Sequence, residues 1–236
     1  YVYHEDTLYV IEVNPRSSRT VPFLSKATGT PIINLATKIA LGKTIAALGY
    51  EGGLLRPRPF TAVKAPVFSF AKLYQLETSL GPEMKSTGEV LGINRYLPQA
   101  LYRALLAAEF SLPLRGNILV TIADKNKRES LPLIQKFKEM GFNIFATRGT
   151  AFFLEKAGLK IKRINKIREG SPHVLDLIHS GKINLVLNTL TKGKMPHTDG
   201  FRIRRAAAEH NIPCFTSLDT ALAAEKILEE LSKGKN

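Results

Sequence analysis

The fold is decided by the stretch "ILVTIADKNKRESLPLIQKFKEMGFNIFAT" (residues 118–147). It opens with ILVTIA, a short and mainly aliphatic run that suits a strand buried on both faces. The following KNKRESLPLIQKFKEMG predicts an amphipathic helix that Gly141 ends, and NIFAT predicts a second strand. A strand, a helix and a strand in this order favour parallel pairing through a right-handed crossover.

The same couplet of strand and helix recurs to the end of the chain. The later strand segments are NIFAT, KIKRI, NLVLN and IPCFT, and the helix segments that follow them are GTAFFLEKAG, SPHVLDLIHSG, GFRIRRAAAEHN and LDTALAAEKILEEL. With ILVTIA and its helix they make five couplets. The sequence therefore predicts an α/β domain over residues 115–236, in which helices flank a five-stranded parallel sheet.

The chain before residue 115 has a less regular pattern. Apolar residues at spacings of three and four predict a helix over residues 34–48. The proline-rich run that follows predicts short extended pieces, and LGPEMKSTGEVLGINR predicts an ordered surface loop. Residues 97–110 predict a second helix, and SLPLRGN (111–117) predicts a hinge. The hinge separates this part of the chain from the α/β domain; the resemblance described below implies that it divides into a first domain at residues 1–60 and a connecting segment at residues 61–114.

Composition limits the possible classes of protein. With 236 residues, of which 44% are apolar, the chain can bury a core. Its one cysteine, Cys214, points to a reducing compartment and to no structural zinc. No apolar run approaches the roughly 20 residues that span a bilayer, so we expect a soluble, cytoplasmic protein without membrane contact. The net charge of +14 is spread over helix surfaces among acidic residues, which favours solvated surfaces over a nucleic-acid interface.

Ligands of a parallel sheet bind outside the carboxyl ends of its strands, where helix N-termini expose backbone amides. The loops at these ends read ADKNK, ATRGTA, INKIREGSPH, NTLTKGK and TSLDT. They suit a phosphate cradle with Thr147, Thr150 and the amides around Gly149 as its floor, and with Lys127 and Lys166 as its charges. Taken singly, each threonine or lysine also fits a helix cap or a solvated surface. Their convergence on one rim favours a binding site.

A second polar group lies in IEVNPRSSRT (residues 11–20). If LYVIEVNPR is a strand, Glu12 and Asn14 share one face at a spacing of roughly 7 Å, where two oxygens can bracket a divalent cation. Arg16 and Arg19 follow where anionic oxygens could be held. The alternative is an edge strand with solvated polar residues.

The sequence resembles the C-terminal portion of the large subunit in the carbamoyl-phosphate synthetase family. The resemblance rests on IEVNPRSSRTVPFLSKATGTPI, LGPEMKSTGEVLG, ATRGTA, NKIREGSPH and INLVLNT, which are spread over nearly the whole chain. It implies that residues 1–60 close the second ATP-grasp unit, which phosphorylates carbamate. It also implies that Glu12 and Asn14 bind Mg²⁺ or Mn²⁺ at the ATP phosphates, and that Arg16 lies beside the transferred phosphoryl group.

The resemblance further implies that residues 115–236 form a methylglyoxal-synthase-like allosteric domain that binds a nucleotide monophosphate effector. The residues at the matching positions are Lys127, Thr147, Thr150, Lys166, Asn188 and Thr189. It implies an ATP-dependent ligase of arginine and pyrimidine synthesis, whose partners are the remainder of the large subunit and the glutaminase small subunit. The fragment or split chain alone is expected to be inactive, because the other half of the ATP site is not in it.

Departures from the family leave two points open. Leu190 replaces a second threonine in NTLTKGK, which affects the effector preference, and Ala65 replaces a glutamate, which argues against activation by ornithine. A stand-alone methylglyoxal-synthase-type lyase is an alternative that needs catalytic carboxylates in the third and fourth loops. Those loops have Ser171 and Thr191 in the approximate positions, with Glu169 as the nearest carboxylate and His173 as a substitute only in principle.

Overall fold

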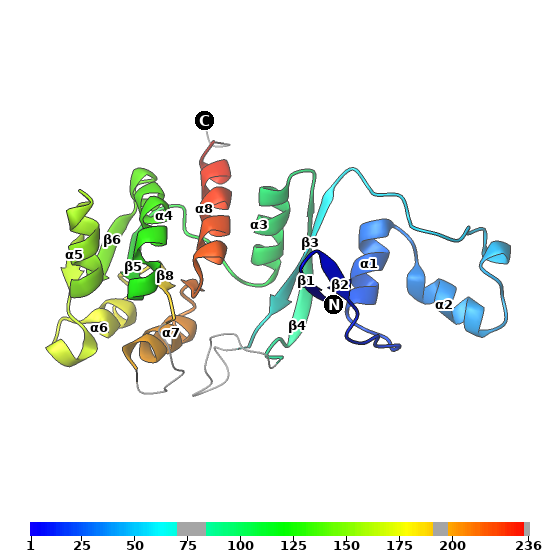
Figure 1. Ribbon diagram of the computed structural model, residues 1–236, viewed down its shortest axis with the longest axis horizontal. Helices are drawn as coiled ribbons and strands as arrows, with labels where there is room; N and C mark the ends of the chain where they lie inside the picture. The colour runs from blue at the N-terminus through cyan, green and yellow to red at the C-terminus, as the bar shows by residue number, and fades with distance from the viewer. Residues whose placement is uncertain (70–83, 191–197, 234–236) are drawn as a thin grey trace. The chain divides into compact units, whose positions relative to one another are not determined.

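The computed structural model describes residues 1–69, 84–190 and 198–233 (Figure 1). The chain divides into two compact units, Tyr1–Pro59 and Phe60–Asn236. None of the helices in the described ranges has the length and apolarity that crossing a membrane requires.

The first unit holds a small hairpin and two short helices. Strands β1 (Val2–His4) and β2 (Thr7–Tyr9) pair antiparallel, and they are followed by helices α1 (Thr20–Thr28) and α2 (Ile32–Ala40) and by the 3-10 helix η1 (Ala46–Leu48). The strand predicted through LYVIEVNPR ends at Tyr9, so that prediction was too long. Val2 pairs with Tyr9, and the paired residues of the hairpin end there.

The predicted helix over residues 34–48 was also wrong in its bounds. Helix α2 begins at Ile32, directly after Pro31, and ends at Ala40. The N–H of Gly42 donates to the carbonyl of Ile39 (2.9 Å) with a φ of +90°, a backbone conformation that glycine adopts at little cost. The chain turns there, and only the short η1 follows.

The second unit begins with a two-stranded ribbon covered by a helix. Strands β3 (Thr61–Val67) and β4 (Gly88–Asn94) pair antiparallel, and helix α3 (Leu97–Ala107) packs against both. Part of the segment predicted as a surface loop is therefore strand β4. Its GEVLGIN sequence offers only a weak alternation, and β4 is stabilised by its pairing with β3 and its packing under α3.

The main sheet confirms the predicted fold class. Its five strands run in the order β7-β6-β5-β8-β9, and every neighbouring pair is parallel. The strands are β5 (Asn117–Thr121), β6 (Asn143–Thr147), β7 (Lys162–Ile164), β8 (Leu185–Asn188) and β9 (Cys214–Phe215). The helices are α4 (Lys127–Glu139), α5 (Arg148–Lys156), α6 (Val174–His179), α7 (Asp199–Glu209) and α8 (Leu218–Lys233), with short 3-10 helices η3 (Asp124–Asn126) and η4 (Ile167–Glu169).

Two buried clusters show that helices cover both faces of this sheet. Along β5, Ile118 and Val120 belong to the cluster that contains α4, α5 and α8, whereas Leu119 belongs to the cluster that contains α6 and α7. Side chains of a strand alternate between its two faces, so this division marks the two layers of helices (Figure 1). Both faces are apolar, which explains why the strands read as nearly continuous aliphatic runs.

Candidate functional site

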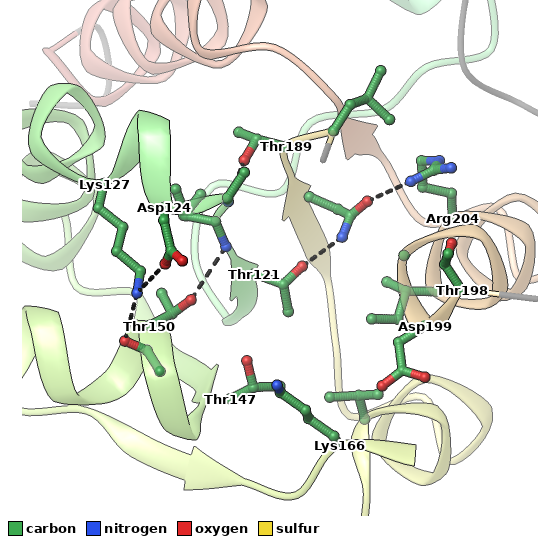
Figure 2. A pocket seen from close by; sticks show the side chains of 18 residues that line it. Thr121, Asp124, Lys127, Thr147, Thr150, Lys166, Thr189, Thr198, Asp199 and Arg204 are labelled. Atoms are coloured by element: carbon green, nitrogen blue, oxygen red, sulfur yellow. Dashed lines mark hydrogen bonds and ion pairs between the residues drawn. The ribbon is translucent and has the colours of Figure 1, made fainter. Parts of the chain in front are cut away.

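A cavity of about 320 Å³ lies at the carboxyl ends of the strands, between β5, β6 and β8 (Figure 2). The strand order is β7-β6-β5-β8-β9. From β5 the chain forms β6 and then β7 on one side, and it then crosses back to form β8 and β9 on the other side of β5. A crevice forms where the order reverses, and ligands of open α/β sheets bind at this point. The cavity therefore lies where the topology predicts a binding site.

All six residues predicted as the effector site line this cavity. They lie at or just after the ends of β6 and β8, in the first turns of α4 and α5, and directly before η4, and they are Lys127, Thr147, Thr150, Lys166, Asn188 and Thr189. Thr147, Thr150, Asn188 and Thr189 are each less than a tenth exposed, whereas Lys166 is exposed. The structure thus brings together residues that are separated by as much as 62 positions in sequence, from Lys127 to Thr189.

Two of the threonines hold the loop that follows β5. The N–H of Ile122 donates to Thr150 Oγ1 (3.2 Å), and the N–H of Ala123 donates to Thr189 Oγ1 (2.8 Å). These bonds tie the loop to α5 on one side and to β8 on the other. A hydroxyl that accepts a hydrogen bond still carries its own proton to donate, so both threonines retain a donor.

Lys127 brings a positive charge to the first turn of α5. Its Nζ donates to the carbonyl oxygen of Gly149 (3.0 Å) and lies 2.7 Å from Asp124 Oδ1, and its side chain is 19% exposed. The hydrogen bond and charge of Lys127, with a smaller effect of Lys166, lower the pKa of the Asp124 carboxyl below its usual value. Asp124 is therefore ionised at neutral pH.

The sequence analysis missed the side of the cavity formed by α7. Thr198 caps this helix by accepting from the N–H of Phe201 (3.3 Å), and Asp199 and Gly200 line the cavity beside it. The spacing from Thr198 to Phe201 is a sequence signal for a helix N-cap that could have identified this end. No local signal marks Asp124, which reaches the cavity from the short η3.

Arg204 and Thr121 complete a chain of hydrogen bonds that the sequence did not indicate. Arg204 Nη1 donates to Asn188 Oδ1 (2.8 Å), and Asn188 Nδ2 donates to Thr121 Oγ1 (2.6 Å). Arg204 is only 6% exposed although it carries a full charge. These bonds fix the orientation of the Asn188 amide. The Thr121 hydroxyl accepts one of them, so it keeps its own proton to donate to another group.

Three of the four residues that a lyase would use, Glu169, Ser171 and His173, do not line the cavity. Glu169 Oε2 accepts from the N–H of Lys166 (2.8 Å), and Ser171 Oγ donates to Asp176 Oδ2 (2.8 Å). The backbone N–H of His173 also donates to Asp176, which lowers the pKa of that carboxyl, and Ser171 adds to the effect. Glu169, Ser171 and His173 are not among the lining residues, and Thr191 lies outside the residues that the structure describes.

The N-terminal candidates Glu12 and Asn14 lie side by side on an exposed segment. Asn14 Nδ2 donates to Glu12 Oε1 (3.0 Å), and the N–H of Arg16 donates to the carbonyl of Asn14 (2.8 Å) in a tight turn. Rotating the Asn14 amide by half a turn exchanges the positions of its nitrogen and its oxygen. An oxygen of Asn14 and an oxygen of Glu12 can then both bind a hard cation. Within the described residues, no cluster of three or more histidine, cysteine, aspartate or glutamate side chains could hold a metal ion.

Comparison with known proteins gives matches at both ends of the chain. Residues 1–48 match the family model described as carbamoyl-phosphate synthase L chain, ATP binding domain. Residues 129–216 match the family model described as MGS-like domain. Among solved structures, the chain resembles methylglyoxal synthase from Elizabethkingia anophelis NUHP1 at 23% sequence identity, covering 50% of this chain and 79% of that chain with a TM-score of 0.40.

The two family matches follow one another in the order that the sequence resemblance predicted. The MGS-like match contains five of the six predicted effector residues, and Lys127 lies just before it. The chain therefore belongs to the carbamoyl-phosphate synthase large-chain family, of which it carries the C-terminal portion: the end of the ATP-binding domain followed by an MGS-like domain.

Proposed function

We propose that the cavity binds a nucleoside monophosphate that regulates the synthetase. The observation that carries this proposal is the gathering of all six predicted side chains around one cavity of about 320 Å³. This volume falls within the range of small-molecule pockets, roughly 300–1,000 Å³. Lys127, Lys166 and Arg204 contribute positive charge to its wall, which suits an anionic ligand.

The phosphate group is best accommodated at the start of α5. Thr147 precedes this helix with extended backbone angles and is only 8% exposed, and Gly149 and Thr150 occupy its first turn. The first amides of a helix have no partner within the helix and attract anions. Lys127 lies at the same end through its bond to Gly149. The wall formed by Asn188, Arg204 and Thr198 is then left for the ribose and base.

Replacing Thr147 by alanine tests this assignment. The variant loses a hydroxyl donor at the phosphate, which weakens binding by roughly 1–3 kcal/mol, or about 5- to 150-fold. The measurement is isothermal titration of uridine and inosine monophosphates into the wild-type chain and into Thr147→Ala. Thr37→Ala, on exposed α2, is the control and should bind like the wild type. Equal binding to the wild type and to Thr147→Ala would remove the pocket from the proposal.

We assign separate tasks to three parts of the chain. Residues 1–60 contribute to carbamate phosphorylation, residues 61–114 connect, and residues 115–236 bind the effector. A bound effector shifts the active site between two states by its difference in affinity for them, typically 1–3 kcal/mol. The remainder of the large subunit and the glutaminase small subunit complete a cytoplasmic synthetase that serves arginine and pyrimidine synthesis.

The N-terminal segment supplies part of the ATP site in this proposal. Glu12 and Asn14 offer two oxygens to Mg²⁺ or Mn²⁺, which prefer more ligands than this pair provides. The cation neutralises charge on the ATP phosphates when it is bound. Arg16 follows Asn14 by two residues in the sequence. In this proposal its guanidinium contacts the phosphoryl group that ATP transfers.

The alternative, a methylglyoxal-synthase-type lyase, finds less support in the site. Its carboxylate in the third loop would have to be Glu169, which caps the first turn of η4 and does not line the cavity. Asp199 follows the fourth loop and Asp124 follows the first strand, and both line the cavity, but the carboxylate required from the third loop is not among the lining residues. We therefore favour effector binding over catalysis at this site.

A further inference from the structure

Two carboxylates line the cavity, Asp124 and Asp199, and Asp124 is the one that contacts the proposed phosphate-binding cation. Asp124 is a carboxylate at the end of the cavity that we assign to the phosphate, and its Oδ1 lies 2.7 Å from Lys127 Nζ (Figure 2). Its side chain is 94% exposed, whereas that of Lys127 is 19% exposed. The ammonium is thus the anchored member of the pair, and the carboxylate contacts it from the solvent.

The position of Lys127 does not depend on Asp124 alone. Lys127 Nζ also donates to the carbonyl oxygen of Gly149 (3.0 Å), which lies in the first turn of α5. This second contact keeps the ammonium beside the helix N-terminus when the carboxylate is absent. Removing the charge of Asp124 therefore changes the electrostatics of the cavity without displacing its main cation.

A phosphate that binds Lys127 must share the ammonium with this carboxylate or displace it. Two anionic groups that contact the same nitrogen lie only about 5 Å apart, and like charges at that separation repel appreciably even in water. We infer that Asp124 is an internal competitor for Lys127, which lowers the affinity for phosphate and so sets the effector concentration to which the site responds. This inference rests on the proposed function of the cavity.

The state of Asp124 fits this role. Lys127 lowers the pKa of its carboxyl, chiefly through their hydrogen bond and then through its charge, with Lys166 adding a smaller effect. The competitor is therefore charged throughout the neutral pH range. Asp124→Asn keeps the shape of the side chain, removes the charge, and alters a position that is almost fully exposed.

The test is isothermal titration of inorganic phosphate and of uridine monophosphate into the whole chain. We expect Asp124→Asn to bind both ligands about three- to tenfold more tightly than the wild type, because a screened like-charge repulsion is lost. Glu129→Gln is the matched control: Glu129 is exposed in the first turn of α4 and does not line the cavity, yet its replacement changes the net charge equally. It should stay within about twofold of the wild type.

The outcomes separate this inference from the proposed function. If the wild type binds both ligands and Asp124→Asn binds them no more tightly, Asp124 is not a competitor, although the cavity is still a phosphate site. If Glu129→Gln gains the same affinity for the ligands, the effect comes from the change in net charge alone, and this result would also overturn the inference. If neither the wild type nor Asp124→Asn binds either ligand, the proposed function fails and the inference fails with it.

Discussion

Single side chains in this cavity combine a structural task with the binding task that we propose for them. The hydroxyls of Thr150 and Thr189 accept hydrogen bonds from the loop after β5 and keep a proton to donate. Arg204 on α7 orients Asn188 at the end of β8 by a bond of 2.8 Å, and it is buried. The side chains that would contact a ligand therefore also maintain the shape of the cavity. Variants in which one of these side chains is replaced need a check that they still fold.

Glu225 is an ionisable residue that affects stability rather than binding. It lies on α8 and is only 5% exposed, and burial, followed by the charge of Glu229, raises the pKa of its carboxyl. The fold thus favours the protonated carboxyl. Its contribution to stability is full below the ordinary carboxyl pKa and is lost as the pH rises through the raised pKa.

We predict that Glu225→Gln raises the midpoint of thermal unfolding at pH 7, because it removes a charge that the fold disfavours. The gain should shrink towards pH 3, where the wild-type carboxyl is protonated as well. Circular dichroism at the two pH values measures both midpoints. Glu129→Gln, which replaces an exposed carboxylate, is the control and should show little change at either pH. Equal midpoints for Glu225→Gln and the wild type at pH 7 would contradict the argument.

At the scale of elements, strand β4 and helix α3 approach each other closely at Gly92. A Cβ atom added at Gly92 would lie 2.1 Å from the carbonyl oxygen of Ala100 and 2.4 Å from the nitrogen of Ala104. Both of these alanines are fully buried. The helix backbone rests directly on this glycine, so the ribbon and helix pack only because residue 92 has no side chain.

We predict that Gly92→Ala destabilises the chain by roughly 3 kcal/mol, because the clash involves backbone atoms that must move apart. Urea denaturation measures the change in the free energy of unfolding. Gly88→Ala in the same strand is the matched control, since a Cβ there would lie 3.5 Å from Val67 Cβ, an ordinary contact. Similar losses in the two variants would show that glycine is required for strand geometry and not for the approach of α3.

The elements were predictable where the pattern was strong. The helix at Leu97–Ala107 and the alternation of strands and helices after residue 115 agree with their predicted segments. Strand β4 was missed because GEVLGIN alternates poorly and its partner β3 lies more than 20 positions earlier. The strand predicted through Glu12 and Asn14 ends at Tyr9, because a ladder needs a partner and alternation alone does not supply one.

At the scale of the whole molecule, the first unit exposes many large apolar side chains. Examples are Tyr1, Val10, Ile11 and Val13, each more than half exposed. Monomers seldom leave so much apolar surface in contact with water, and such surfaces mark contacts with other protein parts. This agrees with the proposal that residues 1–60 complete an ATP site together with the remainder of the large subunit.

We predict that the chain restores carbamoyl-phosphate synthesis when it is combined with the remainder of the large subunit and the small subunit, and that Glu12→Gln does not. Loss of an outer-shell partner costs metal sites roughly 10- to 100-fold, so losing a direct ligand should cost tenfold or more. The measurement is ATP-dependent synthesis in the reconstituted assembly. Glu5→Gln, in the hairpin turn, is the control with the same charge change. Full activity with Glu12→Gln would exclude Glu12 as a ligand.

The sequence by itself determined the class of the second unit and the rim on which its site lies. Helix and strand periodicities are local, and five alternating couplets imply parallel strands whose carboxyl ends share one edge. Lys127, Thr147, Thr150 and Lys166 were predicted because they lie in the loops at that edge, whereas Asn188 and Thr189 were predicted from the resemblance to a family. The resemblance to a family supplied the roles of these residues, which periodicity does not contain.

Only the tertiary structure decided the strand order, the cavity and the side chains that reach it from α7 and η3. The order β7-β6-β5-β8-β9 depends on how all the helices bury the two faces of the sheet together, and no single couplet contains that information. Arg204 and Asp124 reach the cavity through this global packing, from positions that look like an ordinary helix surface and an ordinary loop. Burial and close contact are properties of the assembled chain, and for this reason local patterns do not reveal them.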